Sequence, residues 1–199
     1  MQRMDALILA GGENRRMPLI KGFLEIRDGR IIEVTIQRLR KVFNRIIIST
    51  NTPEHYYYLG LPMVGDIIQV RGPMTGIFSV LSLPDISVVF VTACDMPDIN
   101  GILIKYIAGR WRSEYDAVVP VFNNEPQPLL GVYAKSVVRR MEEALNHEKK
   151  SLRGFLRDSN VLYIQETDVR KIDPDGRSFV NINTMQDFEK ETGGKTCLV

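Results

Sequence analysis

Cysteine and histidine are scarce in this sequence, and their positions exclude a stapled or zinc-bound fold. Cys94 and Cys197 are far apart and form no Cys-x-x-Cys pair, so neither a disulfide framework nor a zinc motif is indicated. The two histidines, His55 and His147, lack metal-ligand spacing and are expected on the surface. A reducing compartment suits such a chain, and we expect it to be cytoplasmic.

An excess of charge of one sign and a long apolar run are absent as well. The 26 lysines and arginines against 24 aspartates and glutamates give a net charge of +2, so a surface that wraps a polyanion is not expected. The N-terminal apolar run, residues 6–10, stops at two glycines and is too short for a secretory signal or a membrane span. We therefore expect a soluble protein with neither nucleic acid nor a membrane as a partner.

What the sequence does contain is typical of a globular domain. Its 199 residues match the size of one domain, and its composition, 44% hydrophobic and 25% charged, excludes a disordered, collagenous or coiled-coil chain. A chain of this length buries roughly 70% of the surface that it exposes when unfolded, which suffices without a disulfide or a structural metal. We expect a single domain over residues 1–199, with residues 193–199 as a flexible tail.

The hydrophobic pattern predicts strands that alternate with helices. Short apolar runs predict the strands, and apolar residues three or four apart predict the helices. The expected strands span residues 7–10, 45–50, 67–70, 88–91, 116–121, 127–133 and 161–164, and the expected helices span residues 31–43, 76–83, 99–107, 137–145, 152–156 and 185 onward. Strands separated by helices pair in parallel, so we expect an α/β fold, a three-layer αβα sandwich with a mostly parallel central sheet.

Residues 9–21 form the most informative segment. A buried strand that ends in Gly11 and Gly12 exposes backbone N–H groups, and three cations follow within ten residues: Arg15, Arg16 and Lys21. This is an anion-binding pattern, although it is neither a Walker A loop nor the dinucleotide fingerprint. A strand followed by a solvated basic loop is the simpler alternative.

This segment resembles the Leu-Ala-Gly-Gly-x-Ser-x-Arg-Met-Gly-x-x-Lys signature of molybdenum cofactor guanylyltransferases, members of the nucleotidyltransferase superfamily. Five further motifs of that family follow in the same order and extend the resemblance over nearly the whole chain: Asn51, Asp66 with residues 72–76, and residues 94–97, 127–133 and 179–184. The resemblance implies a Rossmann-like nucleotidyltransferase fold. It also implies that residues 1–100 mainly bind GTP and residues 101–192 mainly bind the acceptor.

Three positions depart from the family pattern. Asn14 stands where the family usually has Ser, and Pro18 where it usually has Gly, which makes the tip of the phosphate loop stiffer and removes one hydroxyl. Met185 replaces a Pro that often follows the last motif, at a position that only starts a helix.

The resemblance assigns GTP binding to eight residues: Leu9, Ala10, Gly11, Gly12, Lys21, Asn51, Asp66 and Asp95. Lys21, with Arg15 or Arg16, would neutralise the triphosphate and the departing pyrophosphate, and Arg16, Lys21 and Asp95 are the implied catalytic residues. Asn51 and Asp66 are the implied base readers. A carboxylate can accept from both N1–H and N2–H₂ of guanine, although Asp66 could equally be an exposed loop residue.

Asp95 is the expected metal ligand. It follows a central apolar strand, at the edge where open α/β sheets bind ligands, and Mg²⁺ prefers one or two carboxylates together with substrate phosphates. The alternative is that Asp95 caps the next helix, a role for which Asp98 competes. Cys94 is expected to be a small buried hydrophobic residue rather than a nucleophile.

Asn181 and Asn183 are the implied acceptor-binding residues. They lie two apart, so on an extended segment they project from the same face, which by resemblance would be turned toward the pterin. A turn and cap before the last helix is the alternative explanation. Residues 173–176 are expected to form a type I turn rather than a calcium loop.

The activity implied by the resemblance is transfer of GMP from GTP to molybdopterin, with Mg²⁺ as the cofactor and pyrophosphate as the second product. The implied partners are GTP, molybdopterin or the molybdenum cofactor, and proteins that mature molybdoenzymes. Two alternatives stay open: a related nucleotidyltransferase that uses CTP or a sugar-phosphate acceptor, and a nucleotide-binding module without turnover. Gly12 favours the guanylyl branch, because the other branches more often carry Leu-Ala-Ala-Gly.

Overall fold

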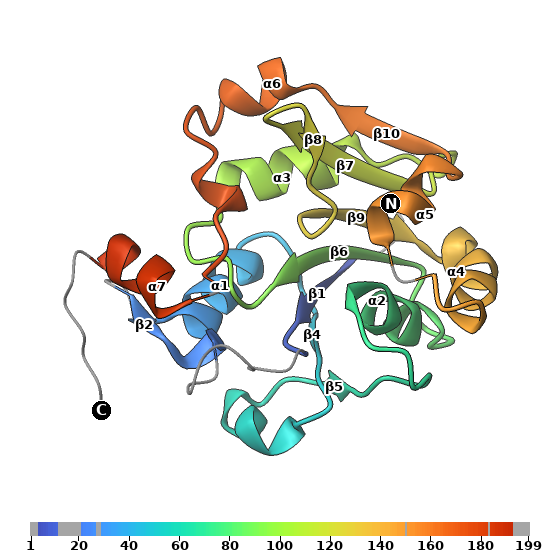
Figure 1. Ribbon diagram of the computed structural model, residues 1–199, viewed down its shortest axis with the longest axis horizontal. Helices are drawn as coiled ribbons and strands as arrows, with labels where there is room; N and C mark the ends of the chain where they lie inside the picture. Colours follow the sequence, from blue (N-terminus) through green and yellow to red (C-terminus); the bar gives the residue numbers. More distant parts are fainter. Residues whose placement is uncertain (1–3, 12–20, 27–28, 150, 183, 193–199) are drawn as a thin grey trace.

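The chain folds around one central sheet. The structure is a computed structural model that describes residues 4–11, 21–26, 29–149, 151–182 and 184–192. Its main sheet has eight strands, which follow one another in the order β10-β7-β9-β6-β1-β4-β5, while β8 pairs with β7. In Figure 1 this order runs from β10 at the top to β5 at the bottom.

The strands and helices have the following bounds. The strands are β1 (Asp5–Leu9), β2 (Glu25–Ile26), β3 (Gly29–Arg30), β4 (Ile46–Ser49), β5 (Met63–Val64), β6 (Val88–Ala93), β7 (Ala117–Phe122), β8 (Glu125–Pro126), β9 (Gly131–Ala134) and β10 (Val161–Ile164). The α-helices are α1 (Ile31–Arg40), α2 (Pro73–Leu81), α3 (Gly101–Arg110), α4 (Val138–Asn146), α5 (Leu152–Arg157), α6 (Glu166–Arg170) and α7 (Met185–Thr192). Short 3₁₀ turns are η1 (Lys21–Phe23), η2 (Pro53–His55), η3 (Tyr57–Leu59), η4 (Lys135–Val137) and η5 (Arg177–Phe179). Among these described helices, none is long and apolar enough to cross a membrane.

Strand β1 lies at the centre of a parallel set. It pairs in parallel with β4 on one side and with β6 on the other, and β4 pairs in parallel with β5. Strand β9 is antiparallel to both of its neighbours, β6 and β7, while β10 pairs in parallel with β7. The expected mostly parallel sheet is therefore confirmed, with β9 as the reversed strand between its two halves.

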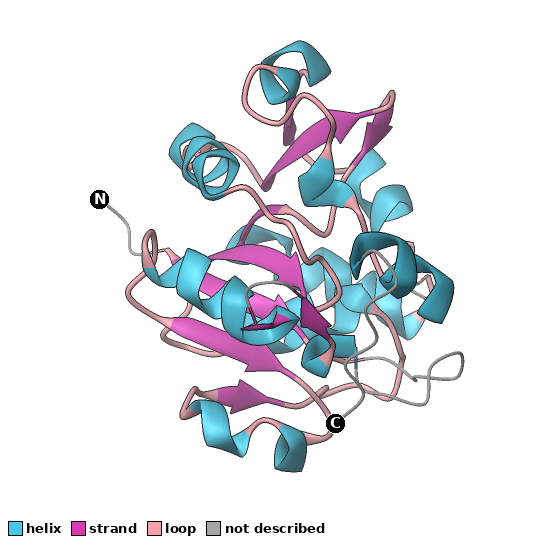
Figure 2. Ribbon diagram, turned by 90° about the vertical axis from the view of Figure 1, so that its left-hand side faces the viewer, coloured by secondary structure: helices cyan, strands magenta, loops and turns pink. Residues whose placement is uncertain are grey.

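Helices cover both faces of the sheet, so the molecule has the expected three layers. Along β1, Ala6 and Ile8 face a cluster that includes α1 and α3, whereas Leu7 and Leu9 face a second cluster with α2, α4 and α5. Figure 1 shows α1 and α3 on one side of the sheet and α2 and α4 on the other, and Figure 2 shows the twist of the strands between them. A strand buried on both faces reads as a continuous apolar run, which is why β1 stood out in the sequence.

Two expected strands differ from the structure. Residues 67–70 form bends rather than a strand, and the strand that pairs with β4 is β5 at residues 63–64. Residues 127–130 form a turn in which the Leu130 amide donates to the Gln127 carbonyl at 3.1 Å, so β9 begins only at Gly131. Both expectations followed apolar residues that lie in loops, where they range from exposed Ile67 to fully buried Leu130.

A third, smaller apolar cluster brings residues near the C-terminus against residues near β2 and β3. Leu24 and Ile31, near the β2–β3 hairpin, pack against Ile182 and against Phe188 of α7. The hairpin was not expected from the sequence, because each of its strands has two residues and no alternating pattern. Through this cluster, the C-terminal segment that carries Ile182 and Phe188 packs against the N-terminal half of the chain.

Asp116 ties three parts of the C-terminal half together at the start of β7. Its carboxylate accepts hydrogen bonds from Ser136 Oγ at 2.6 Å and from the Asn160 amide at 2.9 Å, and it pairs with the Arg140 guanidinium. Burial by itself would raise the pKa of Asp116, but these hydrogen bonds outweigh it and hold the pKa below its usual value.

Asp116→Asn should lower the free energy of unfolding at pH 7 by about 1–3 kcal/mol, because the amide places a donor against the donors that surround it. A depressed pKa contributes stability above the unfolded pKa of about 4, and that contribution is lost as the pH falls through the folded pKa. Urea titrations at pH 7 and pH 3 should therefore show a smaller difference between parent and variant at pH 3. Asp175→Asn, at an exposed carboxylate, is the control and should match the parent. An equal difference at both pH values would contradict the role given to Asp116.

Candidate functional site

A cavity of about 760 Å³ opens where the parallel strands β1, β4 and β6 end. This is the carboxyl edge at which open α/β sheets bind ligands, and the volume falls in the range of small-molecule sites. The residues that line it come from the ends of these strands, from the loops after β4 and β5, from the start of α2 and from the turn before β9: Leu9, Ala10, Gly11, Ser49, Asn51, Thr52, His55, Tyr56, Asp66, Arg71, Gly72, Pro73, Gly76, Ala93, Cys94, Asp95 and Leu129. Six of the sequence-predicted residues therefore meet in one cavity: Leu9, Ala10, Gly11, Asn51, Asp66 and Asp95.

The loop after β1 borders this cavity with exposed backbone. Gly11 is exposed, and a Cβ built on it would meet no atom of the described residues within 4 Å. Gly12, Arg15 and Arg16 lie outside the described residues, as do Asn14 and Pro18. Of Lys21 only the backbone is described, at the start of η1.

The backbone of η1 lies close to the end of β6. A Cβ built on Gly22 would come within 3.7 Å of the Cβ of Cys94, and the Phe23 ring packs against Tyr56, with ring centroids 5.5 Å apart. The 3₁₀ turn that begins at Lys21 is therefore held beside the turn after β6 that carries Cys94 and Asp95.

Asn51 and Asp66 form a reciprocal hydrogen-bonded pair. The Asp66 amide donates to Asn51 Oδ1 at 2.8 Å, and Asn51 Nδ2 donates to Asp66 Oδ2 at 2.7 Å. No described residue donates to the other carboxylate oxygen, Oδ1 of Asp66. Asn51 thus orients the carboxylate and leaves one acceptor oxygen for a ligand with N–H donors.

Two glycines explain how α2 reaches the cavity. Gly72, just before the helix, has φ 153° and ψ 167°, a conformation open in practice only to glycine. Gly76 lies against the sheet: a Cβ built there would be 2.6 Å from Ser49 Oγ and 2.9 Å from Leu9 Cδ2. The N-terminus of α2, with its partial positive charge, can therefore lie directly beside the ends of β1 and β4.

Asp95 lies half-buried in the turn after β6, and it does not cap the helix that follows. The N-cap of α3 is Asn100, whose side chain accepts hydrogen bonds from the Ile102 and Leu103 amides. The capping alternative for Asp95, and for its competitor Asp98, is therefore wrong. The Asp95 carbonyl instead accepts a hydrogen bond from the Ile182 amide at 2.9 Å.

That backbone hydrogen bond places Asn181, the residue before Ile182, next to Asp95 in space. Oδ1 of Asn181 is buried and has no hydrogen-bond partner among the described residues. Asn181 plays no part in capping α7, because Thr184 makes that cap: its Oγ1 accepts from the Asp187 amide, and Asp187 Oδ2 accepts from the Thr184 amide. Asn183, the second predicted acceptor residue, lies outside the described residues.

Asp95 and Asn181 fit a hard divalent cation. Together they offer a carboxylate and a buried carbonyl oxygen that lacks a hydrogen bond, and oxygen is the ligand that Mg²⁺ prefers. Within the described residues there is no group of three or more His, Cys, Asp or Glu side chains that could hold a metal by themselves. A cation here would therefore need oxygen atoms from a bound phosphate to complete its coordination.

Several cavity residues were missed from the sequence. His55 is exposed, as expected, but it lines the cavity; Tyr56 lines it too, and burial raises the pKa of its phenol, which stays neutral at physiological pH. Cys94 is half-buried: it packs against the core cluster, as expected of a small hydrophobic residue, and it also lines the cavity. Arg71 adds a cation beside the N-terminus of α2, and its position directly before the Gly72-Pro73 turn was the available signal.

The chain resembles known proteins over most of its length. A family model described as the MobA-like NTP transferase domain matches residues 6–165. A protein of Peptoclostridium acidaminophilum named "Probable molybdenum cofactor guanylyltransferase" is 36% identical over 192 residues, which cover 94% of this chain and 87% of the relative. The molybdenum cofactor guanylyltransferase of Syntrophotalea carbinolica is 35% identical over 187 residues, which cover 94% and 89% of the two chains.

The fold has a solved counterpart. The crystal structure of molybdopterin-guanine dinucleotide biosynthesis protein A from Archaeoglobus fulgidus superposes with a TM-score of 0.80 and 24% sequence identity. The match covers 95% of this chain and 97% of that chain. This chain therefore has the same fold as that crystal structure over nearly its whole length.

Gly76→Ala should destabilise the protein by about 1–3 kcal/mol, the usual result of adding an atom to a packed interface. The new Cβ would overlap Ser49 Oγ and Leu9 Cδ2, so α2 has to move away from the sheet. Gly109→Ala is the matched control, because a Cβ at Gly109 in α3 meets nothing within 4 Å and alanine favours a helix by up to about 1 kcal/mol. Thermal unfolding of the two variants measures the difference; a Gly76→Ala melting temperature at or above that of Gly109→Ala would contradict the close approach.

Proposed function

This chain belongs to the molybdenum cofactor guanylyltransferase family of MobA-like NTP transferases, and we propose that it transfers GMP from GTP to molybdopterin. The products of this reaction are the guanine dinucleotide form of the cofactor and pyrophosphate. The resemblance drawn from the sequence motifs is confirmed by the family match, and the chain is a nucleotidyltransferase. The observation that carries the substrate assignment is the cavity in which Gly11, Asp66 and Asp95 meet.

Guanine recognition is assigned to the pair of Asn51 and Asp66. The hydrogen bonds between them fix the plane of the Asp66 carboxylate, and its remaining oxygen can accept from N–H groups on the base edge. Guanine carries adjacent N1–H and N2–H₂ donors, whereas cytosine presents an acceptor at the matching ring nitrogen. A carboxylate acceptor at this place therefore supports GTP over CTP.

The triphosphate is assigned to the opposite part of the cavity, near Gly11 and the N-terminus of α2. Backbone N–H groups at the end of β1, the helix dipole of α2 and the Arg71 cation all favour negative charge there. Lys21, with Arg15 or Arg16, would add the charge that compensates the departing pyrophosphate, as their place in the family motif implies.

The metal cofactor that we propose is Mg²⁺, held by the oxygens of Asp95 and Asn181. When bound, it supplies Lewis acidity toward the phosphates. Asn181 then has two roles, because the acceptor pterin must reach the α-phosphate from the side that Asn181 borders; the family resemblance implies the same acceptor-binding role for Asn183. The buried Asn181 oxygen without a hydrogen bond supports this assignment.

The transfer itself requires little covalent chemistry from the protein. The terminal phosphate of molybdopterin attacks the α-phosphorus of GTP in line; a new P–O bond forms and the bond to pyrophosphate breaks. No enzyme-linked intermediate is needed, so the side chains act by positioning the two substrates and by neutralising charge. The product would pass to proteins that mature molybdoenzymes, and the cytoplasm, where GTP is made, is the proposed compartment.

The family assignment does not favour either alternative left open by the sequence, use of CTP or a sugar phosphate, or binding without turnover. The direct test is pyrophosphate release from GTP, ATP, CTP or UTP with molybdopterin and Mg²⁺ present. Release with GTP alone supports the proposal; preferential release with CTP would replace it by the cytidylyl alternative.

Asp95→Asn should lower turnover at saturating Mg²⁺ by at least about 10²-fold, the scale of loss when one preorganised electrostatic contact is removed. The substitution keeps the side-chain volume and removes the charge. The Asp95 carbonyl still accepts from Ile182, so the melting temperature should stay close to that of the parent. Turnover near the parent value in a folded variant would show that Asp95 does not hold the metal.

Asp66→Asn should weaken GTP binding and leave pyrophosphate binding unchanged. The new amide can place a donor against the donors of guanine, and an unpaired buried donor costs roughly 1–3 kcal/mol. Isothermal titration with GTP and with pyrophosphate measures the two affinities separately. GTP affinity within twofold of the parent would rule out Asp66 as the base reader.

A further inference from the structure

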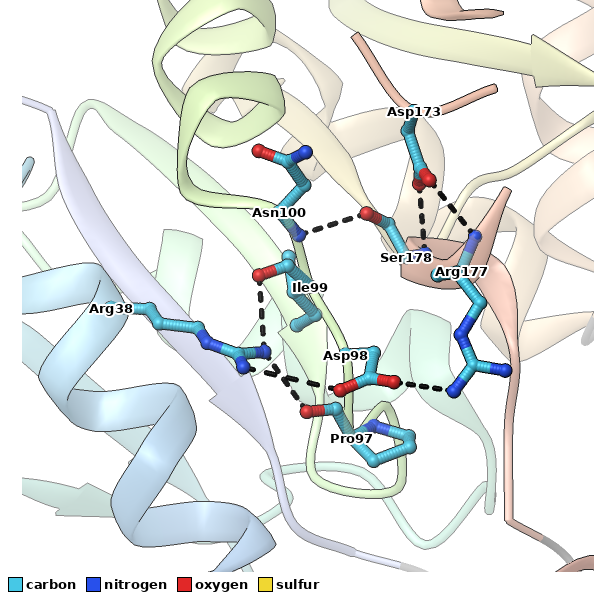
Figure 3. Close-up of polar contacts among 8 residues, drawn as sticks. All are labelled: Arg38, Pro97, Asp98, Ile99, Asn100, Asp173, Arg177 and Ser178. Carbon is cyan, nitrogen blue, oxygen red and sulfur yellow. Dashed lines mark hydrogen bonds and ion pairs between the residues drawn. The ribbon is translucent and has the colours of Figure 1, made fainter. Parts of the chain in front are cut away.

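The loop that carries Asp95, residues 95–100, is clamped from the N-terminal side by Arg38 of α1. Arg38 Nη1 donates to the Pro97 carbonyl at 2.9 Å and to the Ile99 carbonyl at 3.2 Å. Its Nη2 lies 4.0 Å from Asp98 Oδ1. Figure 3 shows the guanidinium reaching the loop from its helix. Three acceptors of one short loop are therefore bound by one side chain.

The same loop is bound from the C-terminal side by η5. Arg177 Nη2 donates to Asp98 Oδ2 at 2.6 Å, and Ser178 Oγ accepts from the Asn100 amide at 2.9 Å. The buried Asp173 carboxylate in turn accepts from the backbone amides of Arg177 and Ser178, which orients η5. Figure 3 shows Asp98 between the two guanidinium groups, each on a different oxygen.

Asp98 thus joins three segments that are distant in the sequence. The Arg38–Pro97 and Arg177–Asp98 contacts span 59 and 79 residues, respectively. The side chains of Arg38, Asp98 and Arg177 are 24%, 38% and 48% exposed, and ion pairs with this exposure add little to stability. What the carboxylate does provide is charge balance, since without it two guanidinium groups would face each other across the loop.

The network of Arg38, Asp98 and Arg177 lies next to the two segments that carry Asp95 and Asn181. Asp95 begins the clamped loop, and Asn181 follows η5 by two residues, where the Ile182 amide donates to the Asp95 carbonyl. The Arg177–Asp98 pair, together with the hydrogen bond from the Asn100 amide to Ser178 Oγ, therefore links the segment that carries Asn181 to the loop that carries Asp95. A change in that link alters the spacing between the two.

We propose that Asp98 is a positioning residue for the acceptor: by pairing with Arg38 and Arg177, it sets the distance between Asp95 and Asn181. This inference rests on the proposed function, in which Asp95 and Asn181 hold the metal and Asn181 also borders the pterin. Asp98 does not line the cavity and touches neither substrate in this scheme. Its loss should therefore affect the use of molybdopterin, whereas GTP keeps its proposed contacts with Gly11, Asn51 and Asp66, which do not depend on Asp98.

The test compares Asp98→Asn, Arg177→Gln and the double variant in steady-state assays that vary GTP and molybdopterin separately. For Asp98→Asn, we expect the KM for GTP to stay within about twofold and kcat/KM for molybdopterin to fall on the order of 10²-fold, as when reacting groups are misplaced by about 1 Å. The double variant should lose no more than the worse single variant, because the two side chains act as a pair. Asp98→Glu, which keeps the charge, should recover most of the activity.

Glu125→Gln is the matched control. Glu125 of β8 accepts a 2.6 Å hydrogen bond from Arg153, a pair as short as that of Asp98 with Arg177 and similarly exposed, but away from the cavity. Its kinetics should match the parent for both substrates. Equal losses for GTP and molybdopterin in Asp98→Asn, additive losses in the double variant, or parent-like kinetics would each overturn the positioning role. If Asp98→Asn does not fold, Arg177→Gln removes the same pair from outside the loop, and the kinetic comparison is then made with that variant.

Hydrogen exchange of the Ile182 amide, which donates to the Asp95 carbonyl, tests the spacing between the two segments without a turnover assay. Its hydrogen exchange should become at least about tenfold faster in Asp98→Asn, while that of the Ala10 amide, which donates to the Ser49 carbonyl, stays unchanged. If the parent releases no pyrophosphate from GTP but the Ile182 amide still responds, the proposed function fails, while the coupling of Asp98 to the hydrogen bond between Asp95 and Ile182 stands. Unchanged exchange at Ile182 in an active protein overturns the positioning role.

Discussion

The parallel pairing of β1 between β4 and β6 is the constraint on which the rest of the molecule depends. Because all three strands point the same way, their carboxyl ends meet at one edge, and the backbone of residues 9–11, the Asn51 side chain and Asp95 arrive there together. Side chains alternate along β1, so one strand anchors α1 and α3 on one face and α2 on the other. The cavity is the space that these layers leave at their common end.

The parts of the fold that follow from local pattern could be predicted from the sequence. The apolar run of β1 and the stripe of α1 each identify one element, and the strand and helix expected at residues 161–164 and 152–156 are present. The runs at 67–70 and 127–130 were misassigned as strands, because partly buried loops use the same apolar residues as short strands. What separates them is pairing with a distant strand, which no local pattern contains.

For the candidate site, the order of the family motifs along the sequence identified most of the residues, but it did not predict the contacts between them. Leu9, Asn51, Asp66 and Asp95 were identified as binding residues and do line one cavity. The hydrogen bonds between Asn51 and Asp66 link positions 15 residues apart, and the Asn100 cap that excludes a capping role for Asp95 depends on where α3 begins. Arg71 and His55 were missed because each reaches the cavity through the path of a loop rather than through a recognisable motif.

The reversed strand β9 has a consequence for how the chain assembles as it is synthesised. Strand β9 lies between β6 and β7, although β7 comes earlier in the sequence. Strand β7 therefore cannot join the half of the sheet that contains β6 until residues 131–134 are made. Until then β6 remains an open edge with unpaired backbone groups, the kind of edge that recruits strands from other chains. The N-terminal half can pair β1 with β4 and β6, and β4 with β5, early, but an exposed apolar edge persists until the ribosome has added about forty residues beyond the end of β6.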